Sequence, residues 1–396
     1  MNRPSSASGN RVERRRDRFL KTFASRSGFV REQGIYEKLK GSGLVPTMLS
    51  AQDGTIETQY EEGENFYEFF QAAGTDPAKQ AACFELFFSW YRKYRELTNI
   101  SIGKTDFRDF ILQGDSLMCL DLEHCSPGSA EEDVARLACM LALYPKGYTA
   151  AGLESAKLFV CVGSSFLNWQ PEILAKSVPA AAAEVEEELG LRKHPGMALY
   201  LAAYFTTAGA VLAGGKSSRM HQDKRQMEVD GRTMLEASTS LVAAMPQRMI
   251  SVARDDDHAE FPGFETIRDE RTDIGPLEGI VRCLRYSRQP WTLFLTCDMP
   301  LLTDKLLRLF LSYPKEDADA FLFKAGGRLQ TFPLLLRTEN AVRALQEAVE
   351  KDERKVQDAL RSRLKIKTIR AEDFEEFAPR MLWNINTPED YEEITK

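Results

Sequence analysis

A glycine-rich segment that also carries several cations is the part of the chain best suited to chemistry. It reads Leu212-Ala213-Gly214-Gly215-Lys216-Ser217-Ser218-Arg219-Met220, follows an apolar run, and precedes Asp223-Lys224. Adjacent glycines let backbone amides approach phosphate oxygens, and the positive end of a following helix assists. A glycine turn without a ligand is the alternative for the glycines alone. However, Lys216, Arg219 and Lys224 lie within nine positions, which suits a triphosphate.

A carboxylate follows another apolar run, WTLFLTC. Asp298 comes directly after this predicted strand and before Met299-Pro300. If both apolar runs are parallel strands, their carboxyl ends meet at one edge of the sheet. A carboxylate at that edge could hold Mg²⁺, which prefers oxygen ligands and usually bridges protein to phosphate. The alternative is that Asp298 caps the helix predicted for PLLTDKLL.

Further polar candidates occur beside three other predicted elements. Ser251 lies in the apolar run ISVAR, and Asp269 in TIRDE precedes the tight turn GPLEG. Asn384 and Asn386 come just before a helix whose first residue is Pro388, with Thr387 as its expected N-cap.

The segments that carry these residues alternate between strand and helix patterns from Thr206 onward. Strands are expected at 208–214, 248–254 and 291–297, and helices at 233–245 and 276–287. This alternation predicts an α/β fold with a mainly parallel, doubly wound (Rossmann-like) sheet, in which ligands bind at the carboxyl ends of the strands. An Ala/Glu-rich helix and a Gly/Pro break between Val178 and Tyr204 suggest a seam, so domains are expected at 1–202 and 203–396.

Taken together, the motifs of the C-terminal half carry a family resemblance. LAGGKSSRM, DK, GPLEGI, CDMP and NINTPEDY, in this order over about 190 residues, resemble the molybdenum cofactor guanylyltransferases. The resemblance implies a nucleotidyltransferase that moves GMP from GTP to the phosphate of molybdopterin with Mg²⁺, releasing pyrophosphate. Relatives that transfer CMP, or that act on sugar or isoprenoid phosphates, usually show Ala-Gly in place of Gly214-Gly215.

The same resemblance implies a role for each matched residue. The terminal phosphate of molybdopterin would attack the α-phosphorus of GTP, and catalysis would rest on positioning and on charge neutralisation by Mg²⁺ on Asp298, the loop amides, Arg219 and Lys224. Asp298 would bind the metal. The family generally has glycine where this chain has His221, so either the His221 side chain points outward or the geometry of the loop and the rate are altered. The residues implied for the nucleotide are Leu212, Ala213, Gly214, Gly215, Lys224, Ser251, Asp269 and Asp298, and those implied for the acceptor are Asn384 and Asn386.

The N-terminal half carries a second resemblance, to the kinase-like α+β fold of small-molecule and lipopolysaccharide phosphotransferases. The features that carry it are a strand at 19–23 containing Lys21, a helix at 34–41 preceded by Arg31-Glu32, two hairpins of which the first turns at Asp53-Gly54, and the carboxylates Asp106 and Asp121. The resemblance implies that Lys21 pairs with Glu32 and contacts ATP phosphates, that Asp106 is the catalytic base, that Asp121 binds metal, and that Asp133 is buried in a following helix.

This N-terminal half also departs from the kinase pattern. No GxGxxG precedes Lys21, and the usual His before Asp106 is missing. Turn, strand-end and surface-helix positions are the alternative readings of Asp106, Asp121 and Glu32. An active phosphotransferase and a degenerate domain that binds a partner or a nucleotide are therefore both open.

Bulk properties narrow the class of protein. The 396 residues are 43% hydrophobic and 28% charged with a net charge of -7, which is typical of a globular protein and argues against a nucleic-acid partner. The seven cysteines show no CxxC spacing, so reduced thiols are expected. No segment predicts a membrane span or a secretory signal, and the cytoplasm is the expected location.

Two other functions stay open. One is a nucleotidyltransferase for another phosphorylated small molecule, transferring CMP to molybdopterin or NMP to a sugar or alcohol phosphate, coupled to an N-terminal kinase. The other is a non-catalytic cofactor carrier. The expected partners are GTP, molybdopterin, ATP at the N-terminal half, and a molybdoenzyme or its chaperone.

Overall fold

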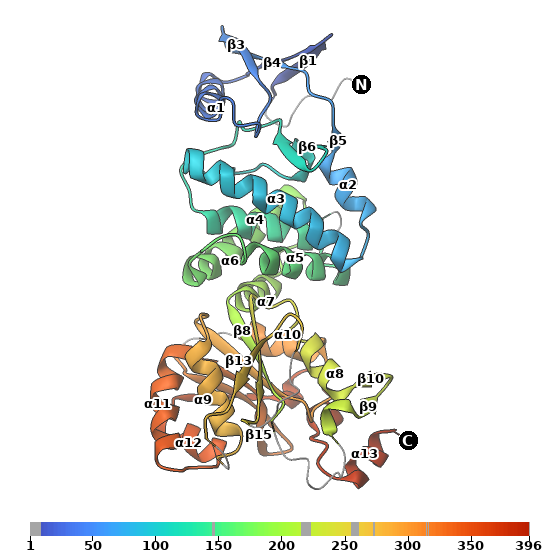
Figure 1. The fold of residues 1–396 in the computed structure, drawn as a ribbon, viewed down its shortest axis with the longest axis vertical. Helices are drawn as coiled ribbons and strands as arrows, with labels where there is room; N and C mark the ends of the chain where they lie inside the picture. The colour runs from blue at the N-terminus through green and yellow to red at the C-terminus, as the bar shows by residue number, and fades with distance from the viewer. Residues whose placement is uncertain are drawn as a thin grey trace. The chain divides into compact units, whose positions relative to one another are not determined.

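The chain forms two compact units in a computed structural model that describes residues 9–144, 147–214, 223–254, 261–271, 274–313, 315 and 317–395. The units are Met1–Lys193 and His194–Lys396 (Figure 1). The boundary predicted at 202/203 falls inside α7 (Pro195–Phe205), whereas the division between the units comes before this helix. Helix α7 belongs to the second unit, where it contacts α10 (Asp304–Ser312).

The first unit is α+β. Its described strands form a four-stranded antiparallel sheet in the order β1-β2-β4-β3 and a three-stranded sheet in the order β5-β6-β7. The strands are β1 (Arg11–Arg15), β2 (Arg18–Thr22), β3 (Met48–Gln52), β4 (Thr55–Gln59), β5 (Glu64–Asn65), β6 (Phe110–Gln113) and β7 (Ser116–Cys119). The helices are α1 (Arg26–Lys38), α2 (Phe66–Ala72), α3 (Pro77–Thr98), α4 (Ala130–Leu143), α5 (Ala150–Gly163) and α6 (Pro171–Glu188).

Local sequence signals account for the hairpins and helix starts of this unit. Asp53 and Gly54, with φ of 50° and 73°, form the turn predicted between β3 and β4. Helix α1 begins at Arg26, earlier than expected, because the Ser25 hydroxyl accepts a hydrogen bond from Gly28 N over 3.1 Å and caps it.

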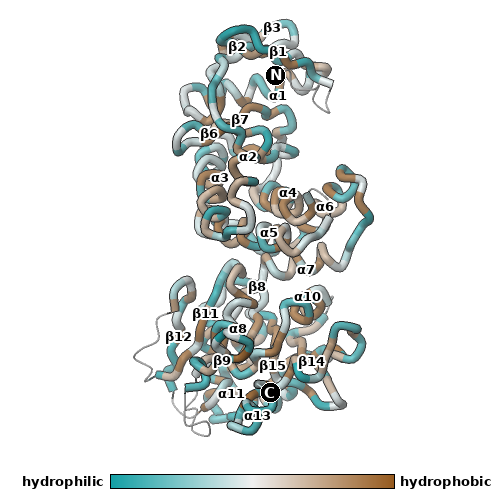
Figure 2. Tube along the Cα trace, turned by 90° about the vertical axis from the view of Figure 1, so that its right-hand side faces the viewer, coloured by the Kyte–Doolittle hydropathy of each residue, from teal (hydrophilic) through white to brown (hydrophobic). Residues whose placement is uncertain are grey.

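Aromatic residues make up the core of the first unit. Phe84, Phe87, Phe88 and Tyr91 of α3 are almost wholly buried, and the Phe159 ring of α5 lies 4.7 Å from that of Phe88. Burial on one side leaves the other side of α3 polar, and its tube in Figure 2 accordingly alternates between hydrophobic and hydrophilic residues.

The second unit is the expected α/β fold. Its strands are β8 (Thr207–Leu212), β9 (Glu228–Val229), β10 (Arg232–Thr233), β11 (Gln247–Val252), β12 (Glu265–Arg268), β13 (Trp291–Thr296), β14 (Ala320–Ala325), β15 (Arg328–Arg337) and β16 (Ile366–Arg370). Its helices, besides α7 and α10, are α8 (Met234–Ser240), α9 (Pro276–Tyr286), α11 (Thr338–Glu350), α12 (Val356–Arg363) and α13 (Pro388–Thr395).

Seven of these strands make one mainly parallel sheet in the order β12-β11-β8-β13-β15-β14-β16. Strands β12, β11, β8 and β13 run parallel to one another, while β15 is antiparallel to both β13 and β14. Because β15 reverses direction between them, β14 ends at the same edge of the sheet as β13. The fold class predicted for the C-terminal half is confirmed, and its parallel strands end at one edge.

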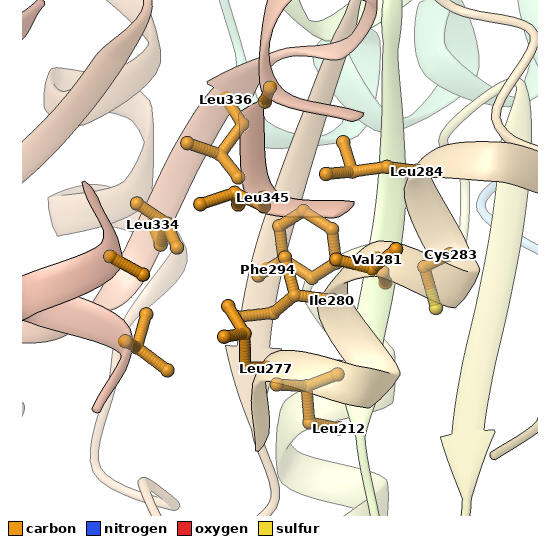
Figure 3. Packing of buried hydrophobic residues seen from close by; sticks show 14 of the residues in the cluster. Leu212, Leu277, Ile280, Val281, Cys283, Leu284, Phe294, Leu334, Leu336 and Leu345 are labelled. Atoms are coloured by element: carbon orange, nitrogen blue, oxygen red, sulfur yellow. The ribbon is translucent and has the colours of Figure 1, made fainter. Parts of the chain in front are cut away.

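A hydrophobic cluster holds three helices against one face of this sheet. Leu277, Ile280 and Leu284 of α9 pack with Phe294 of β13 (Figure 3), and residues of α11 and α12 extend the same cluster. Burying apolar side chains contributes roughly 25 cal/mol per Å² of area removed from water, so this face is a main source of stability for the edge that carries the site.

Across the part of the chain that the structure describes, no helix combines the length and apolar character needed to cross a membrane.

Candidate active site

The end of β8 leads directly into the glycine-rich loop. Leu212 is the last residue of the strand, and its carbonyl accepts a hydrogen bond from Cys297 N over 3.3 Å. Ala213 N donates to Ser251 O over 2.8 Å, and a Cβ on Gly214 would lie 3.2 Å from Ala253 N. The first glycine therefore allows the chain to pass close to the neighbouring strand. Gly215, Lys216, Arg219 and His221 lie outside the described residues.

Lys224 is held at the sheet edge by the motif NINTPED. Its Nζ donates to Ile385 O over 2.8 Å and to Asn386 Oδ1 over 3.1 Å. The preceding residue has a different role, because Asp223 caps the short 3₁₀ helix Lys224–Gln226 and pairs with Arg225 over 2.8 Å. The hydrogen bond from Arg225 lowers the pKa of Asp223. Asp223 thus fixes the backbone from which Lys224 extends.

Asp298 lies beyond the end of β13, next to the same motif. Its backbone carbonyl accepts a hydrogen bond from Ile385 N over 2.8 Å. Helix α10 begins at Asp304 and is capped by Thr303, so the alternative reading of Asp298 as the cap of this helix is wrong. Burial raises the pKa of Asp298, while the positive charge of Lys224 acts in the opposite direction.

The carboxylate of Asp298 fits a cation. Its Oδ1 is buried and has no hydrogen-bond partner among the residues that the structure describes. Leaving such an atom unsatisfied is costly, whereas a divalent cation would compensate both the lost hydration and the negative charge.

A second pair of polar side chains lies at the ends of β11 and β12. Ser251 Oγ lies 3.4 Å from Asp269 Oδ1, and Asp269 N donates to Val252 O over 3.1 Å. Burial, followed by the proximity of Glu278, raises the pKa of Asp269 to about 6. The predicted nucleotide contacts Ser251 and Asp269 are therefore adjacent, at the ends of β11, which neighbours β8, and of β12, which neighbours β11.

The GPLEG turn at the start of helix α9 positions the residues around Asp269 and Ser251. Glu278 is buried, and its Oε1 accepts hydrogen bonds from Glu270 N and Arg271 N over 3.1 and 3.3 Å, which fixes the loop after Asp269. A Cβ on Gly279 would lie 2.4 Å from Ser251 Oγ. Glycine at this position thus leaves room for the serine hydroxyl.

Comparison with known proteins identifies the family of the second unit. Residues 209–367 match the model of the MobA-like NTP transferase domain. A probable molybdenum cofactor guanylyltransferase from Carboxydothermus hydrogenoformans is 31% identical over 193 residues, which cover 47% of this chain and 94% of that protein. This chain belongs to the molybdenum cofactor guanylyltransferase family. Membership confirms the resemblance inferred from the five motifs and makes the protein a nucleotidyltransferase.

Two other relatives cover the same share of the chain. A probable molybdenum cofactor guanylyltransferase from Bacillus cereus is 29% identical over 195 residues, or 48% of this chain and 96% of that protein. The crystal structure of molybdopterin-guanine dinucleotide biosynthesis protein A from Archaeoglobus fulgidus is 23% identical with a TM-score of 0.41, covering 48% of this chain and 96% of that one.

In the first unit, the structure brings together three of the four candidates that the kinase-like resemblance implied. Lys21 Nζ lies 2.7 Å from Glu32 Oε2, 2.8 Å from Asp121 Oδ1 and 3.3 Å from Glu123 Oε2. Burial raises the pKa of Glu32 to about 7. Burial alone would lower the pKa of Lys21, but the carboxylates outweigh it and raise that pKa.

The fourth candidate of that unit is engaged elsewhere. Asp106 caps the short helix Phe107–Asp109, and its Oδ1 accepts a hydrogen bond from Arg108 Nε over 2.9 Å. Asp133, expected to be buried, is 2% exposed and accepts hydrogen bonds from the Tyr91 and Ser101 hydroxyls over 2.6 and 2.5 Å.

Sequence reasoning missed two carboxylates that complete these clusters. Glu278 was predicted only as part of the GPLEG turn. A glutamate between Leu277 and Ile280 on an apolar helix face nevertheless indicates a buried carboxylate that has a polar partner. Glu123 was likewise not predicted as a site residue. Glu123 N donates a hydrogen bond to Asp121 Oδ1 over 3.2 Å at the turn, and both carboxylates reach Lys21.

Proposed function

We propose that this protein transfers GMP from GTP to the phosphate of molybdopterin, forming the guanine dinucleotide cofactor and releasing pyrophosphate. The observation that carries the proposal is the hydrogen bond between Lys224, at the end of the glycine-rich loop, and Asn386 of the closing motif, next to the buried carboxylate of Asp298. Relatives of the C-terminal half bear the name of this activity.

The reaction requires no protein nucleophile. A phosphate oxygen of molybdopterin forms a bond to the α-phosphorus of GTP, and the bond from that phosphorus to the oxygen bridging toward the β-phosphorus breaks. Negative charge develops on the departing pyrophosphate. The protein therefore has to align two anionic substrates and neutralise their charge. Lys224 supplies a fixed cation, and backbone amides of the glycine-rich loop, which continues beyond the described residues, would supply hydrogen-bond donors.

Asp298 would hold the metal ion, which we propose is Mg²⁺. Held there, Mg²⁺ would offset the negative charge of the triphosphate. The chain itself contributes a buried, oxygen-only ligand in a position fixed by the backbone bond from Ile385. Arg219 remains a proposed further cation of the loop, which lies outside the described residues.

The guanosine part of GTP would lie over β11 and β12. Ser251 and Asp269 supply a hydroxyl and a carboxylate there, and an ionised carboxylate accepts hydrogen bonds from ribose hydroxyls or from the amino and imino groups of guanine. Asn384 and Asn386, at the other side of Asp298, would then serve the acceptor.

A substrate matrix tests this function against its alternatives. Purified full-length protein is incubated with Mg²⁺ and each of GTP, CTP, ATP and UTP, with molybdopterin, a sugar phosphate, an alcohol phosphate or no acceptor, and pyrophosphate release is measured. Release with GTP and molybdopterin alone supports the proposal. Preference for CTP or for another acceptor would favour the alternative transferases, and release above background in no combination would favour a cofactor carrier.

A second candidate function concerns the first unit, which we propose binds ATP at the Lys21 cluster. A buried lysine between Glu32 and Asp121 is the ion-pair arrangement used to orient nucleotide phosphates and metal in kinase-like folds. Calorimetry with ATP and Mg²⁺ tests it, with Lys21→Met as the comparison. No binding by the wild-type protein, or equal binding by both proteins, would contradict ATP recognition by this cluster.

A further inference from the structure

Trp383 stands out among the tryptophans of the chain. Its side chain is 41% exposed, whereas Trp90, Trp169 and Trp291 are no more than 9% exposed. It follows the short 3₁₀ helix Pro379–Leu382 and directly precedes Asn384. Exposing a large aromatic surface to water is unfavourable, so an exposed tryptophan beside a predicted substrate residue indicates a binding surface.

The exposed ring lines a depression of about 610 Å³, which is within the usual size range of small-molecule sites. Asn384 and Asn386 line the same depression, as do Ala325, the last residue of β14, and Gly326, which follows it. Because Asn386 bonds to Lys224, the depression opens beside the proposed site of phosphate transfer.

The sheet order separates this depression from the nucleotide side. Ser251 and Asp269 lie at the ends of β11 and β12, and β14 lies on the opposite side of β8 and β13. Asp298, at the end of β13, is therefore between the two. A molecule in the depression can present a phosphate to this centre while GTP approaches from the other side.

The charges of the depression select the kind of molecule that fits it. Within the described chain its lining includes three carboxylates, Glu372, Asp390 and Glu393, and neither lysine nor arginine. Glu372 accepts a hydrogen bond from Gly326 N over 2.6 Å, and Asp390 accepts one from Asn386 N over 2.8 Å. A phosphate would be repelled here. A flat ring rich in N–H donors would stack on the indole and donate to the carboxylates.

We infer that Trp383 is the stacking surface for the pterin ring of the acceptor, with the carboxylates of the depression accepting hydrogen bonds from its amino and amide groups. The inference rests on the proposed function and deepens it. The ring is held away from the phosphate, which lies at Lys224 and Asn386. Trp383 is thus a binding residue that determines acceptor specificity.

Steady-state kinetics with Trp383→Ala and Trp383→Phe test this role. Replacing an aromatic side chain that stacks on a base by alanine commonly lowers the binding affinity about tenfold or more. Trp383→Ala should therefore raise the KM for molybdopterin by about tenfold or more. The KM for GTP should change little, and Trp383→Phe should recover most of the loss. Tyr286→Ala is the matched control, since Tyr286 is an exposed aromatic on α9 of the same unit.

Tryptophan fluorescence gives a readout that does not depend on turnover. The phosphate-free probe 6-hydroxymethylpterin should quench emission from the full-length protein saturably, because Trp383 is the exposed tryptophan. In Trp383→Phe the saturable quenching should be lost. Only the linear decrease in emission that comes from absorption of light by the probe should remain. Saturable quenching that persists in Trp383→Phe would overturn the assignment.

The kinetic results also separate this inference from the proposed function. If wild-type protein transfers GMP but Trp383→Ala leaves the KM for molybdopterin unchanged, the stacking role is wrong and the function stands. If Trp383→Ala raises the KM for both GTP and molybdopterin and the variant melts at a lower temperature than the wild type, Trp383 has a structural role and the inference is again wrong. If wild-type protein transfers no GMP, the proposed function itself fails.

Discussion

Lys224 Nζ donates a hydrogen bond to Asn386 Oδ1 over 3.1 Å, which joins the end of the glycine-rich loop to a motif 162 residues farther along the chain. Ile385, between the two asparagines, adds a bond from its amide to Asp298 O over 2.8 Å. These contacts place a cation, a carboxylate and two amide side chains at one edge of the sheet.

Lys224→Ala should therefore lower kcat and raise the KM for GTP together. A lysine on the phosphates acts in both the ground state and the transition state, and losing one such contact typically costs about 10²-fold to 10³-fold in rate. Initial rates at varied GTP concentration measure this. Arg225→Ala is the control, because the neighbouring cation pairs with Asp223 instead. Equal effects of the two variants would contradict the role of Lys224.

Asp298→Asn should cost at least about two to three orders of magnitude in turnover, since the neutral amide is a poor ligand for Mg²⁺. Burial raises the pKa of Asp298, so its ionised form is unfavourable in the folded protein. Asparagine should therefore leave the melting temperature unchanged or higher. A variant that keeps more than about a tenth of the wild-type rate at saturating Mg²⁺ would remove Asp298 from the metal site.

Asp269→Asn should stabilise the protein in a pH-dependent way. The pKa of Asp269 is raised from 3.8 to about 6, mainly by burial, so the folded state keeps a proton that the unfolded chain loses. Stability then falls as pH rises between these values, and the full cost of the ionised carboxylate is present above about pH 6. The variant should melt at higher temperature than the wild type near pH 7.5, with the difference shrinking toward pH 4.

The same substitution should raise the KM for GTP, because the carboxylate is proposed to contact guanosine. Thermal denaturation at the two pH values, with Glu265→Gln at the half-buried start of β12 as the control, isolates the effect on stability from the effect on GTP binding. A lower melting temperature for Asp269→Asn near pH 7.5 would show that the ionised carboxylate stabilises the fold.

Features of the fold that have a local pattern in the sequence could be predicted, and contacts between distant segments could not. The strand before Asp298 and the sheet class were predictable because apolar runs alternated with amphipathic helices. The start of α7 was not, because Pro195-Gly196 looked like a linker, although proline is favoured in the first turn of a helix. Contacts between distant segments, such as the one from Lys224 to Asn386, were not predicted, since spacing along the chain does not determine them.

A fragment spanning His194–Lys396 should fold alone and retain guanylyl transfer. It contains α7, which packs on α10, together with the whole seven-stranded sheet. About 200 residues suffice for one such domain. A fragment starting at Ala203, the boundary expected from sequence, lacks most of α7 and should be less stable. Circular dichroism and the transfer assay check both. A folded but inactive His194–Lys396 fragment would show that transfer depends on residues 1–193.

The position of bond breakage in GTP tests the central claim most directly. Full-length protein is incubated with Mg²⁺, molybdopterin and GTP labelled at either the α- or the γ-phosphorus, and the products are separated by chromatography. The account predicts that the α-label appears in the pterin product, one GMP per molybdopterin, while the γ-label appears only in pyrophosphate. A γ-label on the pterin product, or an α-label that remains in free nucleotide alone, would contradict guanylyl transfer.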